Sequence, residues 1–242
     1  MRKRIDLVLV ERGLFDSRAK AKAAIEAGGV KVAGQVIARA SEPVDPMAQI
    51  EAVAAHPFVG RGALKLDHAL NLWPIEVEGR VVLDVGASTG GFSQVSLLRG
   101  ARRVYAVDVG QSQLHASLAT DPRLVNLEQT DARSLTTSLV PDLVDLVVCD
   151  ASFIGLAKVL PAGLGLCGPC ADLVALIKPQ FEMGPGGVGK GGVVKDEAAR
   201  EAAASALEAW LGAQGWTVQD RALSPITGSD GNIEYLVWAK KA

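Results

Sequence analysis

The chain has 242 residues, a formal net charge of −2, and a composition that is 49% hydrophobic but only 5% aromatic. This length allows one large domain and a small one, and a core rich in Ala, Val and Leu is typical of α/β packing. Three cysteines are too few for a disulfide framework. No apolar stretch reaches about 18 residues, so we expect no membrane-spanning helix. Because the basic start leads into Asp6 and Glu11 rather than into a secretory signal, we expect a cytoplasmic protein.

The first part of the chain is basic, since residues 1–41 contain nine Lys or Arg and four Asp or Glu, while the remainder is acidic. A basic module on an acidic body favours contact with a polyanion. Apolar periodicity and glycines indicate two helices, a hairpin and a further strand, predicted over 5–13, 18–27, 30–32, 35–37 and 49–53. We predict a small α+β domain over residues 1–56, followed by a linker over 57–61.

This first segment resembles the S4 RNA-binding domain in its order of elements and in residues 4–6, 11–14, 17–21 and 29–32. The one departure is Ala33, because the family usually has Asn before the glycine of the hairpin turn. The resemblance implies a basic surface for folded RNA, and a cationic helix face suits a phosphate backbone. An ordinary solvated helix face is the alternative. The candidate RNA-binding residues are Arg4, Arg12, Arg18, Lys20, Lys22 and Lys31.

A glycine loop over residues 84–92 is the most informative motif of the remaining chain. A buried strand is predicted over 80–83 and a helix from about Gly91, and glycines between them allow positive φ and close approach of a ligand. The spacing differs from the G-x-G-x-x-G pattern of dinucleotide-binding proteins. It resembles the first motif of S-adenosylmethionine-dependent methyltransferases, which implies a cofactor site that includes Asp84, Gly86, Ser88, Gly90, Gly91 and Phe92.

Acidic residues follow three further predicted strands, over 103–107, 124–128 and 143–149. Ligands of open α/β sheets bind at the carboxyl ends of the strands, so Asp108, Asp131 and Asp150 are expected at one edge. An acid in the position of Asp108 can accept both ribose hydroxyls of a nucleoside. The methyltransferase resemblance implies that Asp131 reaches the adenine amine. We predict a Rossmann-like α/β domain over residues 62–242.

The other predicted elements of this domain are a helix over 62–72, a strand over 173–177, a helix over 195–211 and strands over 216–221 and 234–239. The Cys167-Gly168-Pro169-Cys170 sequence is predicted to be a loop, since a redox pair would precede a helix and a zinc site needs four ligands. A glycine-rich segment over 184–192 nearly matches a phosphate-binding loop but has Gly191 where Ser or Thr would bind magnesium. We predict that this segment is a loop over the site.

Four ionisable residues complete the pattern: Lys65 in the first helix of this domain, Asp150 and Lys178 after strands, and Glu234 before the last strand. Their order resembles the catalytic tetrad of FtsJ-type ribose 2′-O-methyltransferases. Together with the S4-like segment, the resemblance narrows to the TlyA, or hemolysin A, family and covers essentially the whole chain. The supporting stretches are 60–66, 84–92, 149–154, 178–182 and 231–234.

The resemblance implies transfer of the S-adenosylmethionine methyl group to a ribose 2′-hydroxyl, with cytidine in ribosomal RNA or a ribosomal subunit as the substrate. That hydroxyl must lose its proton, and a lysine can accept it if its surroundings favour the neutral form. The resemblance assigns this role to Lys178, with positive charge from Lys65, orientation by Asp150, and Glu234 fixing Lys178. The cofactor carries its own leaving group, so no metal is required.

Other functions fit less well. Amine methyltransferases typically have a Pro-Pro-aromatic motif where this chain has Asp150-Ala151-Ser152-Phe153, and Cys149 should face away from the site, unlike a cytosine C5 methyltransferase nucleophile. A noncatalytic RNA-binding or assembly factor is one alternative, which the complete tetrad opposes. A membrane-lytic protein is the other, which the missing spanning segment opposes.

Overall fold

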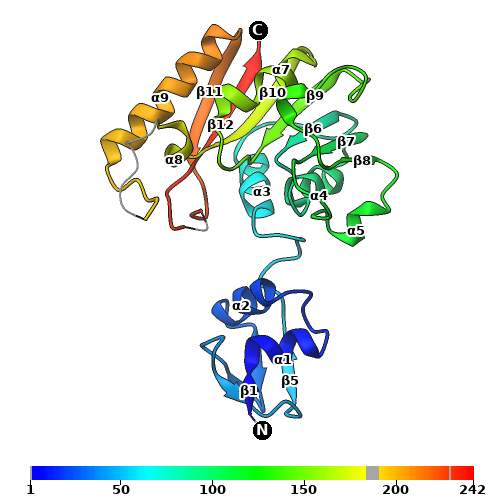
Figure 1. The fold of residues 1–242 in the computed structure, drawn as a ribbon, viewed down its shortest axis with the longest axis vertical. Coiled ribbons are helices and arrows are strands. Elements are labelled where there is room, and N and C mark those ends of the chain that lie inside the picture. The colour runs from blue at the N-terminus through cyan, green and yellow to red at the C-terminus, as the bar shows by residue number, and fades with distance from the viewer. Residues whose placement is uncertain (1, 184–190, 229) are drawn as a thin grey trace. The chain divides into compact units, whose positions relative to one another are not determined.

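The computed structural model describes residues 2–183, 191–228 and 230–242. The chain divides into two compact units, Met1–Pro57 and Phe58–Ala242 (Figure 1). Most of the segment predicted as a linker belongs to the second unit, where Val59 is buried and its backbone N–H donates to Gln94 Oε1 at 2.7 Å. Residues 184–190 of the predicted glycine-rich loop lie outside the described residues.

The first unit is a small α+β fold. Two helices pack against short strands around Ile5, Leu9, Ile25 and Val30. Strand β2 lies between β3 and β5, and β1 pairs with β4, all antiparallel. Its elements are β1 (Lys3–Arg4), α1 (Ile5–Glu11), α2 (Arg18–Glu26), β2 (Val30–Val32), β3 (Gln35–Val36), β4 (Pro43–Val44) and β5 (Ile50–Ala52).

Local sequence explains two features of this unit. Helix α2 begins after Ser17, whose side chain accepts the Lys20 backbone N–H at 3.3 Å and so satisfies one free donor of the first turn. The predicted hairpin turn is present, and Ala33 and Gly34 both have positive φ, 48° and 80°. Such a turn favours Asn-Gly, so Ala33 adopts a conformation that alanine tolerates poorly.

The second unit is a Rossmann-like α/β fold with a seven-stranded sheet in the order β11-β12-β10-β9-β6-β7-β8. The five strands from β10 to β8 are parallel, and β12 and β11 extend the sheet antiparallel. The strands are β6 (Val81–Val85), β7 (Arg103–Val107), β8 (Leu124–Leu127), β9 (Val144–Cys149), β10 (Cys167–Ile177), β11 (Trp216–Leu223) and β12 (Tyr235–Lys241). The helices are α3 (Ala63–Leu72), α4 (Gly91–Leu98), α5 (Ala116–Ala119), the 3-10 helix η1 (Ala132–Ser134), α6 (Leu156–Val159), α7 (Pro161–Gly165), α8 (Pro179–Glu182) and α9 (Glu197–Ala213).

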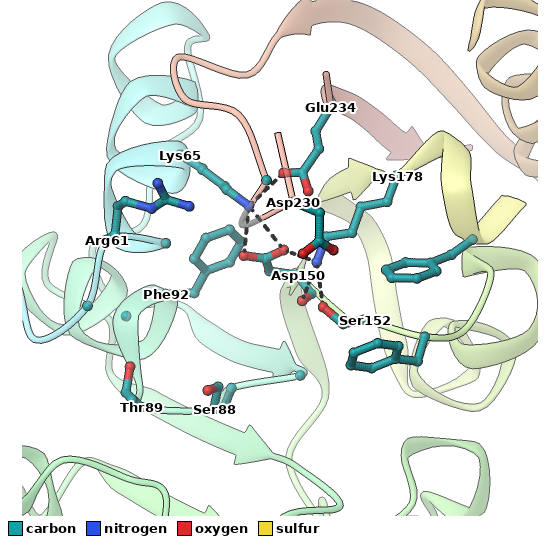
Figure 2. Close-up of a pocket in the computed structure, with 18 of the residues that line it drawn as sticks. Arg61, Lys65, Ser88, Thr89, Phe92, Asp150, Ser152, Lys178, Asp230 and Glu234 are labelled. Carbon is teal, nitrogen blue, oxygen red and sulfur yellow. Dashed lines mark hydrogen bonds and ion pairs between the residues drawn. The ribbon is translucent and has the colours of Figure 1, made fainter. Parts of the chain in front are cut away.

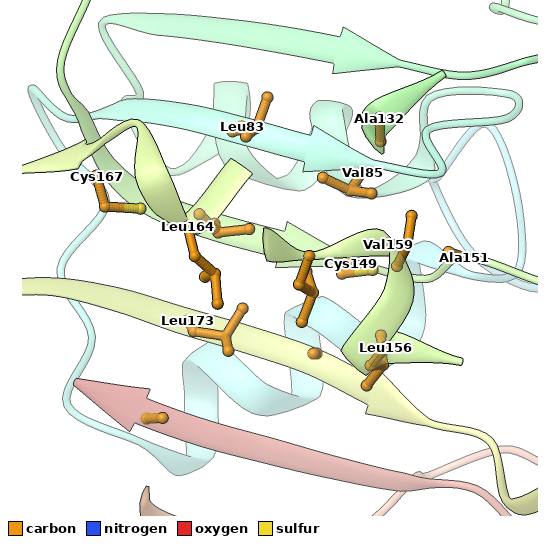
Figure 3. Packing of buried hydrophobic residues seen from close by; sticks show 14 of the residues in the cluster. Leu83, Val85, Ala132, Cys149, Ala151, Leu156, Val159, Leu164, Cys167 and Leu173 are labelled. Carbon is orange, nitrogen blue, oxygen red and sulfur yellow. The ribbon is translucent and has the colours of Figure 1, made fainter. Parts of the chain in front are cut away.

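The sheet has an apolar layer on each face, because successive side chains of a strand point to opposite sides. In β6, Leu83 and Val85 pack with the cluster that includes residues of α6, α7 and α9, and Figure 3 shows this cluster around Cys149 and Leu164. Val82 belongs to the opposite cluster, which includes residues of α3 and α4. Since both faces are covered, β6 is apolar at every position except Asp84, and it leads into the glycine loop.

The predicted loop at Cys167–Cys170 is wrong, because these residues form the first part of β10. The register against β9 shifts between Cys167 and Asp172, as in a β-bulge, and Cys170 has φ 61°. A bulge accommodates Pro169, which cannot donate to the sheet, and so allows the strand to extend through a turn-like sequence.

Candidate active site

Four predicted catalytic side chains meet at the carboxyl ends of the parallel strands (Figure 2). Asp150 directly follows β9 and Lys178 directly follows β10. Glu234 directly precedes β12, which runs antiparallel to β10, so its first residues lie at the same edge of the sheet. Lys65 reaches this edge from α3. The topology therefore brings together residues that are far apart in the sequence.

Lys65 lies between two carboxylates. Its Nζ is 2.7 Å from Glu234 Oε2 and 3.3 Å from Asp150 Oδ2. Lys65 and Glu234 are almost fully buried, at 6% and 3% exposure. Buried charges require partners, and Asp150 and Glu234 supply them for Lys65.

Lys178 shares Asp150 with Lys65. Its Nζ is 2.6 Å from Asp150 Oδ1 and also donates to the Asp150 carbonyl at 3.1 Å and to Ser152 Oγ at 2.9 Å. The expectation that Glu234 fixes Lys178 is wrong, because Glu234 pairs with Lys65. The reason is that α3 inserts Lys65 beside the start of β12, while Lys178 reaches the segment that follows β9.

The glycine loop after β6 is closely packed. Gly86 has φ 82°, and a Cβ atom there would lie 2.8 Å from Ala151 Cα. The Gly86 and Ala87 N–H groups both donate to the Val107 carbonyl, at 2.9 and 3.0 Å. Asp108 Oδ2 accepts the Ser88 N–H at 2.8 Å. These bonds hold the loop against the end of β7, and the close approach of Gly86 to Ala151 packs it against the segment after β9.

Two cavities open beside this loop and share five lining residues, Gly86, Ser88, Asp150, Ser152 and Phe153. The first cavity, of about 280 Å³, contains the four catalytic candidates. The second, of about 470 Å³, lies at the ends of β6 and β7 and has a mixed lining, with Asp108 and Asp131 among apolar side chains such as Val109, Ile154 and Val159. A ligand with a polar reactive end and a flat apolar end would suit this pair of cavities.

Six of the eight predicted cofactor residues line these cavities. Gly86 and Ser88 line both, Gly91 and Phe92 line the first, and Asp108 and Asp131 line the second. Asp131 is already paired, since its Oδ1 accepts the Arg133 backbone N–H at 2.9 Å, and bonds from the Arg133 guanidinium lower the pKa of Asp131 to about 2.

Asp84 and Gly90 are absent from the residues that line the two cavities within the described chain. Asp84 is fully buried on the α4 side of the sheet, where its Oδ2 accepts the Ser93 hydroxyl at 2.6 Å. Burial is the main cause that raises its pKa to about 7, the nearby charges of Asp150 and Asp108 contribute to the rise, and the hydrogen bonds from Ser93 oppose it. Gly90 has φ 88° and directly precedes α4 as its N-cap residue. Both residues therefore support the loop from within rather than line the cavities.

Several residues that line the first cavity were not predicted from the sequence, among them Arg61, Ser152, Phe153 and Phe181. Phe153 is 90% exposed and has φ 66°. Its ring lies 5.3 Å from that of Phe181, between centroids. An aromatic residue in the short loop that follows a strand-end acid, three positions after Asp150, is the signal that sequence reasoning could have used, since such loops often carry binding residues.

The six predicted RNA-binding residues occupy different positions in the first unit. Three of them, Arg4, Arg18 and Lys22, line one open groove of about 490 Å³ together with Arg39, which sequence reasoning missed. Arg12 donates to the Ala48 carbonyl at 2.8 Å, and Lys20 to Asp16 at 2.8 Å. Lys31 is exposed on β2. The structure thus gathers half of the predicted set at one groove.

Cys149 is fully buried, as predicted, and burial raises the pKa of its thiol to about 12. A thiol in this state is not a nucleophile at neutral pH. In the part of the chain that the structure describes, no helix is long and apolar enough to cross a bilayer. The described residues also include no group of three or more His, Cys, Asp or Glu side chains that could hold a metal ion.

Comparison with known proteins gives two family matches, an FtsJ-like methyltransferase over residues 58–241 and an S4 domain over residues 3–50. The 16S/23S rRNA (cytidine-2′-O)-methyltransferase TlyA of Mycobacterium tuberculosis is 46% identical over 99% of this chain and 90% of its own length. Hemolysin A of Brachyspira hyodysenteriae is 37% identical over 96% and 98%. A solved structure of a Streptococcus thermophilus protein, provisionally described as a hemolysin, is 35% identical with a TM-score of 0.78, covering 100% of this chain and 89% of that one.

Proposed function

The chain belongs to the TlyA family of methyltransferases, in which an S4 domain precedes an FtsJ-like domain, and we propose that it methylates the ribose 2′-hydroxyl of a cytidine in ribosomal RNA. The observation that carries this proposal is the Lys65–Asp150–Lys178–Glu234 cluster beside the glycine loop. A ribosomal RNA substrate would also place the activity in the cytoplasm.

S-adenosylmethionine is the proposed cofactor, and the lining of the two cavities fits it. Asp108 offers a carboxylate to ribose hydroxyls, and Val109, Ile154 and Val159 offer apolar surface to a purine. Asp150 lines both cavities and provides negative charge where they meet, which suits a sulfonium ion. When bound, this cofactor supplies an electrophilic methyl group that carries its own leaving group.

The two lysines have different surroundings, which support different roles. Lys65 contacts two carboxylates, whereas Lys178 contacts one carboxylate and two uncharged oxygens. We therefore assign proton acceptance from the ribose hydroxyl to Lys178 Nζ, and stabilisation of the developing oxyanion to the Lys65 ammonium. Asp150 holds both amino groups at the cavity. Glu234 holds Lys65 in place through their ion pair.

The substrate assignment rests on the first unit and on the site entrance. Four basic side chains line the groove of the first unit, which suits a phosphate backbone. At the catalytic cavity, the exposed ring of Phe153 beside Phe181 offers a surface on which a base can stack. The choice of cytidine comes from the named activity of the Mycobacterium tuberculosis relative.

The test uses purified chain, labelled S-adenosylmethionine, and large and small ribosomal subunits from a strain that lacks this activity. We expect 2′-O-methylcytidine in ribosomal RNA, and loss of at least about 100-fold in turnover for Lys178→Ala. Lys195→Ala, which removes an exposed lysine away from the cavities, is the matched control. Tight RNA binding without methyl transfer to either subunit would instead favour a noncatalytic binding factor.

A further inference from the structure

The groove of the first unit contains a buried acid among its arginines. Asp6, in the first turn of α1, is only 3% exposed. Its Oδ1 and Oδ2 accept Arg4 Nε and Nη2, each at 3.0 Å, and its Oδ2 also accepts Arg18 Nε at 3.1 Å and Nη2 at 2.8 Å. One carboxylate therefore holds two guanidinium groups that come from β1 and α2.

Each guanidinium uses only part of its hydrogen-bonding capacity on Asp6. An arginine has five N–H donors in a planar fork, and Asp6 engages the Nε and Nη2 atoms of both Arg4 and Arg18. These bonds to Asp6 do not use the Nη1 groups, which can therefore donate to a ligand. Both arginine side chains are also well exposed, at 48% and 57%, in contrast to the carboxylate at 4%. The acid is thus hidden, while the cations remain open to solvent.

The groove has a positive balance. Arg4, Arg18, Lys22 and Arg39 line it, against the acids Asp6 and Glu26. Bonds from Arg4 make the largest contribution in lowering the pKa of Asp6 to about 2, so the carboxylate is ionised at neutral pH. The negative charge of Asp6 repels a polyanion bound in this groove. The acid therefore weakens binding unless it also organises the neighbouring cations.

We propose that Asp6 is a positioning residue that fixes Arg4 and Arg18 as a paired clamp for the phosphodiester backbone of RNA. The geometry supports a backbone ligand, because a guanidinium fork matches the oxygens of a phosphate and two forks on one carboxylate can engage neighbouring phosphates. The inference rests on the proposed function, since it describes how the first unit binds the RNA substrate. Lys22 and Arg39 continue the same groove.

The proposal makes an unusual prediction, because removing a negative charge should weaken binding to a polyanion. Without the carboxylate, Arg4 and Arg18 must lose side-chain freedom each time RNA binds, and this ordering has a cost for each side chain. We expect Asp6→Asn in the full chain to weaken binding to ribosomal RNA roughly tenfold. Glu51→Gln, which removes the charge of an exposed acid on β5, is the matched control and should leave binding unchanged or slightly tighter.

A double-mutant cycle separates positioning from a general structural role. If Asp6 acts through the arginines, Asp6→Asn should have little further effect on RNA affinity in an Arg4→Ala/Arg18→Ala background. The double variant Arg4→Lys/Arg18→Lys keeps the charges but loses the forks, and it should resemble Asp6→Asn. Methylation assays should show a raised KM for RNA, with kcat at saturating RNA and the S-adenosylmethionine KM unchanged.

Thermal unfolding of each variant accompanies these assays, because Asp6 is buried. Equal or tighter RNA binding by Asp6→Asn, or unchanged binding by the double lysine variant, would overturn the proposal. Full additivity in the cycle would overturn it as well. If the chain shows the expected dependence on Asp6 in RNA binding but transfers no methyl group, the proposed function fails and the positioning role stands.

Discussion

At the scale of single residues, Asp84 combines complete burial with a position in the last part of β6, two residues before Gly86. Its Oδ2 accepts the Ser93 hydroxyl, while Oδ1 has no hydrogen-bond partner among the described residues. An unpartnered buried carboxylate oxygen favours the protonated acid. This explains in physical terms why the pKa of Asp84 is raised to about 7.

The raised pKa predicts a pH-dependent stability. Because the folded chain keeps a proton on Asp84 that the unfolded chain releases from about pH 4, stability falls as the pH rises through the range from about 4 to 7. Asp84→Asn cannot ionise, so we expect it to lose this dependence and to be more stable than the wild type at pH 8 by about 1–3 kcal/mol. Chemical denaturation at pH 5 and pH 8 measures the difference.

Ser93→Ala provides the complementary variant. Removing the hydroxyl that donates to the carboxylate disfavours ionisation further, so the pKa of Asp84 should rise and the loss of stability should extend to higher pH. If Asp84→Asn follows the same pH dependence as the wild type, the carboxyl is not responsible.

At the scale of elements, two glycines of the glycine loop, Gly86 and Gly90, should differ in how well they tolerate a side chain. A Cβ atom at Gly86 would meet the Ala151 backbone, whereas one at Gly90 would meet the ends of the Leu114 and Leu118 side chains. Both positions have positive φ, so each alanine costs about 1–3 kcal/mol in backbone strain. Side chains can shift and the backbone cannot do so cheaply, so we expect Gly86→Ala to destabilise by more than about 3 kcal/mol and Gly90→Ala by less.

Thermal unfolding of the two alanine variants gives this comparison, and S-adenosylmethionine binding adds a second measurement. Gly86 lines both cavities, so its variant should also lose cofactor affinity, while a folded Gly90→Ala should keep most of it. Equal destabilisation by the two substitutions would contradict the packing argument.

The same elements show how far sequence reasoning reaches. Strand-end acids and the glycine loop were predictable because apolar runs, period and glycine spacing are local signals. The ion-pair partner of Glu234 could not be predicted. The sequence places Glu234 at a strand end but does not indicate which lysine lies beside it. The bulge at Pro169 and the positive φ of Phe153 depend on tertiary packing, which overrides the local preference.

At the scale of the whole molecule, the proposed function assigns substrate binding to one unit and chemistry to the other. The basic groove belongs to Met1–Pro57, and the tetrad and both loop-side cavities belong to Phe58–Ala242. RNA binding through the groove releases counterions from the phosphates, but the buried ion pairs of the tetrad are shielded from salt. Added salt should therefore weaken RNA binding and have little effect on the methyl-transfer step.

We expect kcat/KM for ribosomal RNA to fall steeply between 50 and 200 mM salt, with a logarithmic slope of about −3 if the four basic groove residues all contact phosphates. The kcat at saturating RNA and the affinity for S-adenosylmethionine should change little. Arg4→Ala/Arg18→Ala should reduce the steepness by about 1.5–2, since two phosphate contacts are lost. A slope that this double variant leaves unchanged would mean that the RNA is held by another surface, whereas a matching fall in kcat would mean that salt disturbs the tetrad itself.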